Sequence, residues 1–269
     1  MPAVGAIVAN DEWAIDFKGW FRTRAGMRCD PLTITDTASR YLVEVRIVDP
    51  TETGVKYAME RVFDQVGLPS AIRSDNGPPF GSTGAGGLSR LSVWWLKLGI
   101  EPRYIPPSSP QDNGRHERMH RTLKAETSKP ASKTATEQQD RFDRFRQHFN
   151  EERPHEALDQ EPPAKFWRPS CIKLPKRLDD PWYDAEYDVR RVRSRGIIKW
   201  RGEHIFIGKA FIDELVGLTE HESGNYIVRF CERELGVIDR SHRFRSFAPP
   251  RVRLRASQQP AALNLQPGA

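Results

Sequence analysis

Hydrophobic and polar residues alternate in three short stretches near the start of the chain, at residues 13–17, 31–35 and 41–48. A period of two, rich in β-branched residues, is typical of β-strands that bury one face. Residues 36–40 lie between the second and third stretches and have the composition of a turn. The pattern therefore predicts a first strand followed by a hairpin.

After Thr51 the spacing of apolar residues becomes that of a helix. The Thr51 side chain can cap the N-terminus of this helix, and Gly67 is the corresponding stop signal. Six apolar residues recur between them at helical spacing: Val55, Ala58, Met59, Val62, Phe63 and Val66. Residues 71–75 then predict a short strand, and the glycine-rich segment 81–87 predicts a mobile loop.

Helices and strands continue to alternate up to about residue 150. Helices are predicted at residues 88–98, from residue 111 or 112 onward, and, after an interruption at residues 130–132, up to about residue 150. A short strand is predicted near residues 103–105, before a proline-rich break. Strands followed by mixed strands and helices favour an α/β layer fold over a helical bundle.

The pattern changes again near residue 168. A segment rich in Pro, Asp and Arg predicts a linker. Beyond it, five short strands predict a small all-β barrel, at residues 197–200, 203–207, 214–218, 225–230 and 235–238. The predicted division is a short lead (1–10), an α/β core (11–167), a linker (168–195), the barrel (196–245) and a disordered basic tail (246–269).

Composition narrows the class of partner. Lysine and arginine (42) exceed aspartate and glutamate (36), giving a net charge of +6 that favours polyanionic partners such as nucleic acids. No apolar run approaches the roughly 20 residues that span a bilayer, and no secretory signal is visible, so no membrane partner is expected. Cys29, Cys171 and Cys231 lie far apart without a CxxC pair, which suits a reducing cytosol.

The most informative stretch of the chain, residues 110–124, has two incompatible interpretations. His116, Glu117 and His120 match H-E-x-x-H, in which two histidines bind zinc and the glutamate is a general base. That helix is normally enclosed, and here it carries four cations around its circumference: Arg115, Arg118, Arg121 and Lys124. Because burying unpaired cations is costly, we disfavour a zinc protease.

The alternative makes Glu117 a direct ligand of a hard cation. Asp16 and Asp75 each end a predicted strand, and Glu117 lies one to two turns into a predicted helix. A two-metal site needs acidic side chains that converge from separate elements, and oxygen-only ligands suit Mg²⁺ or Mn²⁺. This interpretation also accounts for Asp16 and Asp75, which a zinc protease leaves unexplained.

Five stretches, in order along the chain, carry a resemblance to a known family. They are 13–19 (WAIDFKG), 35–41 (TDTASRY), 68–69 with 73–77 (LP, RSDNG), 110–114 with 117–118 (PQDNG, ER) and 149–155 (FNEERPH). Over residues 10–167 the chain is similar to bacterial insertion-sequence transposases with a retroviral-integrase-like catalytic core. The resemblance implies an α/β RNase H-like integrase core, with a mixed five-stranded sheet flanked by helices, followed here by a small all-β SH3-like barrel.

The same resemblance implies the chemistry of the site. Asp16, Asp75 and Glu117 are expected to be the catalytic acidic triad and to bind two Mg²⁺ ions, or Mn²⁺ in their place. The expected partners are DNA, as transposon ends and target, and further copies of the chain in a homo-oligomer on DNA. A bacterial, nucleoid-associated cytoplasmic location follows.

Five residues are expected to contact DNA: Lys18, Asn113, His120, Arg121 and Lys124. The last three share one helical stripe with Glu117, at spacings of three, four and seven residues. A cationic stripe beside a metal-binding carboxylate suits approaching phosphates, although a solvated charged face is the plain alternative.

Two features depart from the family pattern. The segment between Asp75 and Glu117 is longer than in many integrases, with residues 81–87 as the expected excess. Only about ten residues precede the first predicted strand, where such transposases usually carry a helix-turn-helix region. Asp36, at the predicted hairpin turn, is interpreted as a structural residue rather than a member of the triad.

The barrel leaves two roles open. Its cations Lys199, Arg201, Lys209, Arg229 and Arg233 alternate with Trp200, Phe206 and Tyr226, a pattern that can follow a nucleic-acid backbone or form an ordinary wet charged face. For the whole chain, the favoured function is metal-dependent cleavage of DNA 3′ ends and strand transfer. The alternatives are an RNase H-like nuclease without strand transfer and a truncated, non-catalytic DNA-binding transposase remnant.

Overall fold

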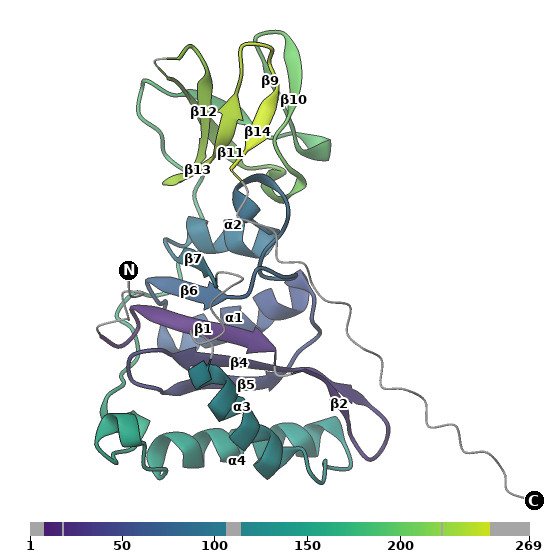
Figure 1. Ribbon diagram of the computed structural model, residues 1–269, viewed down its shortest axis with the longest axis vertical. Helices are drawn as coiled ribbons and strands as arrows, with labels where there is room; N and C mark the ends of the chain where they lie inside the picture. Colours follow the sequence, from purple (N-terminus) through teal and green to yellow (C-terminus); the bar gives the residue numbers. More distant parts are fainter. Residues whose placement is uncertain (1–7, 18, 106–113, 222, 248–269) are drawn as a thin grey trace, which may run out of the picture.

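A computed structural model describes residues 8–17, 19–105, 114–221 and 223–247, with the backbone alone for residues 114–118. A mixed five-stranded sheet forms the centre of the first region, in the order β5-β4-β1-β6-β7 (Figure 1). Its strands are β1 (Glu12–Phe17), β4 (Pro31–Asp36), β5 (Leu42–Ile47), β6 (Ala71–Ser74) and β7 (Glu101–Tyr104). This sheet, flanked by helices and followed by an all-β region, confirms the predicted fold class.

Strand directions within the sheet change at β1. β1 pairs antiparallel with β4, and β4 antiparallel with β5, which confirms the predicted hairpin. On its other side β1 pairs parallel with β6, and β6 parallel with β7. The carboxyl ends of β1 and β6 therefore meet at one edge.

One face of the sheet packs on α1 (Glu52–Val66) and α2 (Arg90–Lys97). α1 begins where predicted, because the Thr51 hydroxyl accepts a 3.1 Å hydrogen bond from the amide of Gly54. Trp13 and Ile15 of β1 bury their side chains against this layer. Since side chains alternate along a strand, Ala14 and Asp16 lie on the opposite face.

The opposite face is covered by α3 (Gly114–Thr127) and α4 (Ala135–Glu151), which cross near β5 (Figure 1). Met119 and Leu123 of α3 pack with Phe142 and other phenylalanines of α4. The buried Asn150 side chain closes the edge of the sheet, accepting from the Leu42 amide (2.8 Å) and donating to the Leu42 carbonyl (2.9 Å). The predicted start of α3 at residue 111 or 112 lies outside the described residues.

A second hairpin, absent from the sequence prediction, follows β1. β2 (Phe21–Arg22) and β3 (Arg28–Cys29) form only two residue pairs and extend away from the central sheet (Figure 1). Strands this short carry too little alternation for a pattern to detect.

The C-terminal region forms two small sheets, in the orders β14-β13-β12-β11-β8 and β10-β9. All five predicted strands are present: β9 (Ile197–Trp200), β10 (Glu203–Phe206), β11 (Leu215–Glu220), β12 (Tyr226–Phe230) and β13 (Arg233–Ile238). β8 (Asp188–Arg191) and β14 (Phe244–Ser246) add two more. β8 pairs with β11, so the segment predicted as a linker over 168–195 also contributes one strand to the C-terminal sheet. The predicted tail beyond residue 247 lies outside the described residues.

Short 3₁₀ helices occur at η1 (Ala85–Gly87), η3 (Glu156–Leu158), η4 (Pro163–Lys165), η5 (Ser194–Gly196) and η6 (Lys209–Phe211). Across the residues placed by the structure, no helix combines the length and apolar character needed to cross a membrane.

The prediction of a mobile loop over 81–87 is wrong at η1. Ala85 and Leu88 are buried in the same hydrophobic cluster as the strands of the C-terminal region. Gly86 has a left-handed backbone (φ 64°), and an added Cβ would lie 3.3 Å from Leu235. The segment is therefore a docking surface between the two regions, not a loose loop.

α2 completes this contact from the other side. Trp95 of α2 is buried in the core cluster, whereas Val93 is buried in the C-terminal cluster. The Lys97 ammonium lies 2.8 Å from a Glu214 carboxylate oxygen, and both side chains are largely buried. α2 thus packs against both the core and the C-terminal region.

We expect Leu88→Ala to lower the free energy of unfolding by about 2–5 kcal/mol, because it leaves a cavity in the shared cluster. The weakened junction should also split denaturant unfolding into two transitions, monitored by circular dichroism and tryptophan fluorescence. Leu68→Ala is the matched control, since Leu68 is equally buried but belongs to the core cluster alone. A single, wild-type-like transition for Leu88→Ala would contradict the coupling.

Candidate active site

Two of the three predicted acidic residues lie at the same edge of the central sheet. β1 and β6 are parallel neighbours in which Ala14 is opposite Arg73. Asp16 and Asp75 each come two residues later, so both lie at the carboxyl ends of these neighbouring strands. The carboxyl ends of adjacent parallel strands are where open α/β sheets bind ligands.

Asp16 is held from two directions, and its side chain is 28% exposed. Thr33, its partner on β4, donates a 3.1 Å hydrogen bond from its hydroxyl to the Asp16 carbonyl. His120, from α3, places Nε2 2.7 Å from that hydroxyl and Nδ1 3.9 Å from the Asp16 carboxylate. The three residues tie α3 to the end of β1.

The His120 side chain is only 4% exposed and lies beside Asp16, and the DNA contact predicted for it stays a prediction. Nε2 of His120 and the Thr33 hydroxyl share a hydrogen bond whose donor is set by the tautomer of the ring. His120 is a positioning residue that fixes Asp16 relative to α3.

Asp75 lies in a turn just beyond β6, with its side chain exposed to solvent. One carboxylate oxygen accepts a 3.1 Å hydrogen bond from the amide of Gly77, as a turn aspartate does. Nevertheless, the protein atoms packed around the carboxyl raise its pKa, while the Gly77 hydrogen bond acts in the opposite direction. The hydrogen bond in the turn uses one carboxylate oxygen of Asp75, which is compatible with a second role of this carboxylate as a metal ligand.

Glu117 lies in the first turn of α3, three residues before His120. Residues three apart share one side of a helix, and His120 on that side contacts Thr33 near Asp16. The side chain of Glu117, and Lys18 and Asn113 entirely, lie outside the described residues. Among the side chains that are described, no group of three or more His, Cys, Asp or Glu could hold a metal ion.

The predicted stripe of α3 divides into two sides. His120 points into the protein with its neighbour Met119, whereas Arg121 and Lys124 are exposed. The sequence spacing placed these three residues on one stripe, but contact with α4 and the sheet determines which side chains of α3 face inward. Arg121 and Lys124 keep the exposure that a phosphate contact requires.

Asp36 is completely buried, and its carboxylate is occupied by the protein itself. It accepts hydrogen bonds from the amide of Asn10 (2.6 Å) and from both the amide (2.7 Å) and hydroxyl (2.6 Å) of Ser39. These contacts close the β4–β5 turn and support the structural interpretation of this residue.

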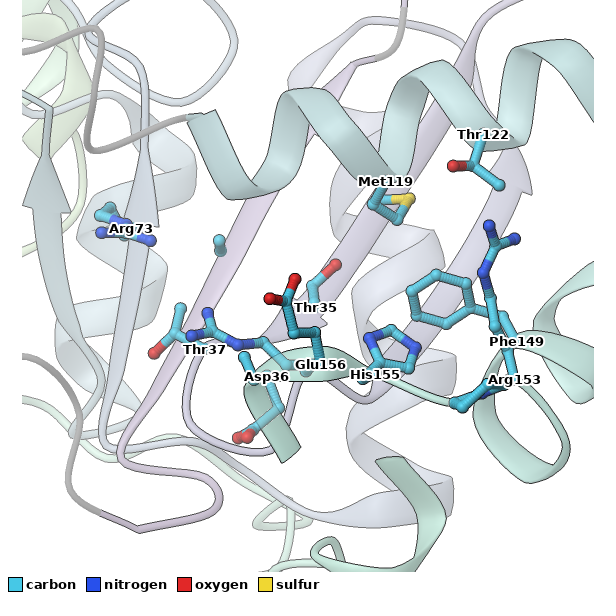
Figure 2. A pocket seen from close by; sticks show the side chains of 14 residues that line it. Thr35, Asp36, Thr37, Arg73, Met119, Thr122, Phe149, Arg153, His155 and Glu156 are labelled. Atoms are coloured by element: carbon cyan, nitrogen blue, oxygen red, sulfur yellow. The ribbon is translucent and has the colours of Figure 1, made fainter. Parts of the chain in front are cut away.

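A cavity of about 400 Å³ lies on the face of the sheet that carries Ala14 and Thr35, and the sequence did not reveal it (Figure 2). Ala14 and Thr35 form part of its floor, each two residues from Asp16 or its partner Thr33. Figure 2 shows Met119 and Thr122 reaching from α3 toward His155 and Phe149. Residues of the stretch 149–155, namely Phe149, Arg153, Pro154 and His155, therefore form one wall of this cavity.

Several polar atoms that line the cavity are buried without a hydrogen-bond partner among the described residues. They are Thr35 Oγ1, Thr37 Oγ1, Arg73 Nε and His155 Nε2. Arg73 is compensated in part by an ion pair with Glu12, at 3.4 Å. Burial and the neighbouring cations Arg153 and Arg40 lower the pKa of His155, which favours its neutral ring.

Some basic and aromatic residues of the C-terminal region are engaged with one another, whereas Phe206 is 56% exposed. The Arg201 guanidinium lies 4.7 Å from the ring centroid of Trp200 and 4.6 Å from that of Tyr226. Arg229 donates to Glu234 at 2.8 Å. Trp200 is buried, so the alternation seen in the sequence is not a row of exposed stacking platforms.

Sheet order and strand directions define a mixed α/β core with helices on both faces, followed by an all-β region. Residues 98–163 match the integrase core domain family, and residues 187–245 match the C-terminal domain of IS481 family transposases. The first matched segment lies in the α/β core and the second coincides with the all-β region.

Two of the curated relatives come from bacterial insertion elements. The uncharacterized 39.2 kDa protein of insertion element IS476 from Xanthomonas euvesicatoria is 31% identical over 164 residues, covering 58% of this chain and 44% of that protein. The 31.7 kDa protein of IS407 from Burkholderia multivorans is 29% identical over 160 residues, covering 58% and 55%. The chain thus spans about half the length of these relatives.

Among solved structures, a chain of the simian T-cell lymphotropic virus intasome in complex with PP2A regulatory subunit B56 gamma is similar in fold. The TM-score is 0.50 at 15% sequence identity, over 83% of this chain and 73% of that one. This similarity supports the fold alone.

Thr35→Val should raise the free energy of unfolding by about 1 kcal/mol, because it replaces a buried, unpartnered hydroxyl by a methyl group of the same shape. Thr33→Val, two residues away on the same strand, should lower it by roughly 1–3 kcal/mol, since that hydroxyl joins Asp16 to His120. Urea unfolding of both variants measures the difference. Equal destabilisation by the two would disprove this account of the cavity.

Proposed function

We propose that this protein is a metal-dependent polynucleotidyl transferase that cleaves DNA 3′ ends and joins them to target DNA. One observation carries the proposal. Asp16 and Asp75 end adjacent parallel strands, and the His120–Thr33–Asp16 contact ties the helix that bears Glu117 to the same point. This arrangement supports a site in which three acidic residues from separate elements meet at one edge of the sheet.

The donor chemistry fits a hard divalent cation. Carboxylate oxygens are the ligands that Mg²⁺ and Mn²⁺ prefer, and Asp16, Asp75 and Glu117 would hold two such ions. Because burial raises the pKa of Asp75, a nearby positive charge would stabilise the ionised form of its carboxylate. Bound ions would supply the charge that activates water and stabilises the leaving oxygen of a phosphodiester.

The protein's own groups mainly position the reactants. His120 and Thr33 hold Asp16, and the Gly77 amide orients the Asp75 carboxylate. Arg121 and Lys124 are exposed on α3 and would contact phosphates of the bound strand. In the first step water attacks the phosphodiester at the transposon end; in the second, the freed 3′-hydroxyl attacks a target phosphorus and displaces a 3′ oxygen.

The proposal extends to partners and place of action. Transposon ends and target DNA are the substrates, and Lys18 and Asn113 would add contacts to them beside the site. Joining two ends to one target requires two active sites, which supports a homo-oligomer assembled on DNA. The relatives belong to bacterial insertion elements, which supports action on the bacterial nucleoid in the cytoplasm.

Asp16→Asn, Asp75→Asn and Glu117→Gln should each reduce Mg²⁺-dependent nicking of end DNA by about a hundredfold or more, since each removes one metal ligand. Circular dichroism should show an intact fold. Asp64→Asn is the matched control, because Asp64 is an exposed acid on α1, on the other side of the sheet. Wild-type nicking by any triad variant would remove that residue from the site.

A joining assay separates the proposed transferase from its two alternatives. Labelled end DNA, supercoiled target and Mg²⁺ should yield joined products as well as nicked ends with the wild-type chain. Nicking without joining would identify a nuclease. Salt-dependent DNA binding with neither reaction would identify a non-catalytic remnant.

A further inference from the structure

The β2–β3 hairpin presents an unusually exposed tryptophan. The Trp20 side chain is 57% exposed, although tryptophan is among the residues that are highly buried on average. Two guanidinium groups lie near its ring, with the Cζ atoms of Arg22 and Arg28 at 5.7 and 5.1 Å from the centroid. Such cation–π contacts hold the ring in place without burying it.

The hairpin that carries Trp20 is anchored to the rest of the core. The amides of Arg24 and Ala25 donate to the carbonyls of Ser132 (2.9 Å) and Lys133 (3.1 Å), in the segment between α3 and α4. Beside Trp20, the Phe21 ring packs edge-on against Phe142, with centroids 6.3 Å apart. The aromatic ring is therefore presented by a fixed platform.

Trp20 lies close to the carboxylates. It follows Asp16 by four residues, and four residues of fully extended chain reach at most about 14 Å. The bases of a stacked strand are spaced about 3.4 Å apart, so this reach covers only a few nucleotides. A DNA strand at the acidic site would pass within reach of the hairpin.

The surroundings of the ring suit a polyanion. Arg22, Arg24 and Arg28 are all exposed. Within the described part of the chain, only Arg28 of these three forms an ion pair, with Asp30 at 2.7 Å. The hairpin keeps a positive excess around an open aromatic surface, a combination typical of proteins that bind single-stranded nucleic acid.

We propose that Trp20 stacks on an unpaired nucleobase of the DNA strand next to the acidic site, while Arg22 and Arg24 contact the flanking phosphates. The base must be unpaired because a base within a duplex has both faces covered by its neighbours. The inference rests on the proposed function, since it takes DNA as the substrate. It adds a binding site for a frayed end beside the reacting phosphate.

The test compares a blunt DNA duplex with the same duplex carrying a three-nucleotide single-stranded tail. Fluorescence anisotropy gives the dissociation constant of each at fixed salt, without metal. The wild-type chain should prefer the tailed DNA. Trp20→Ala should reduce the affinity for tailed DNA about 5- to 150-fold and leave that for blunt DNA unchanged.

Two variants control for general effects. Trp20→Phe should retain most of the preference because it keeps an aromatic face. Trp182→Ala should retain all of it, since Trp182 is 81% exposed but lies in the segment between the core and the C-terminal strands.

Arg24→Ala tests the proposed phosphate contact. It should reduce the salt slope of binding by about one while keeping the preference for the tail.

The outcomes distinguish this proposal from the proposed function. A wild-type chain that does not discriminate the two DNAs, or a Trp20→Ala chain that keeps the preference, overturns the stacking site even if cutting and joining proceed. A preference that depends on Trp20 in a chain that neither cuts nor joins supports the stacking site and overturns the proposed function alone.

Discussion

The parallel pairing of β1 with β6 is the constraint on which the site depends. It brings Asp16 and Asp75 to one edge although strands β2 to β5 and α1 lie between β1 and β6 in the chain. A parallel pair needs a crossover, and α1 completes it by burying Met59 and Phe63 against Trp13. The apolar face of α1 therefore does more than fill the core: it sets the register that aligns the two carboxylates.

The position of α3 depends on a mixed inward face. Met119 and Leu123 supply apolar contact with α4, and His120 inserts a polar group that Thr33 satisfies. A buried polar contact of this kind is directional, so it fixes the rotation and height of the helix where apolar packing alone would permit sliding. His120, which belongs to the H-E-x-x-H pattern of zinc proteases, thereby fixes the position of α3 relative to Asp16.

Much of the core followed from local pattern, and the failures have a common cause. Alternation located β1, β4 and β5, and the cap at Thr51 located α1, because these signals are contained within a few residues. Strand-end positions also located Asp16 and Asp75, whereas their adjacency required a pairing between distant segments. β8, the buried η1 segment and the inward turn of His120 were missed because each is decided by a partner far away in the chain.

The contact of α2 and η1 with the C-terminal strands also limits how the sequence can change during evolution. Ala85, Leu88 and Val93 are buried in one cluster with the C-terminal strands, and an added Cβ at Gly86 would lie only 3.3 Å from Leu235. A gene rearrangement that replaced the C-terminal strands alone would leave an apolar patch open on the core. A substitution on one side of the junction therefore restricts which residues the other side can accept.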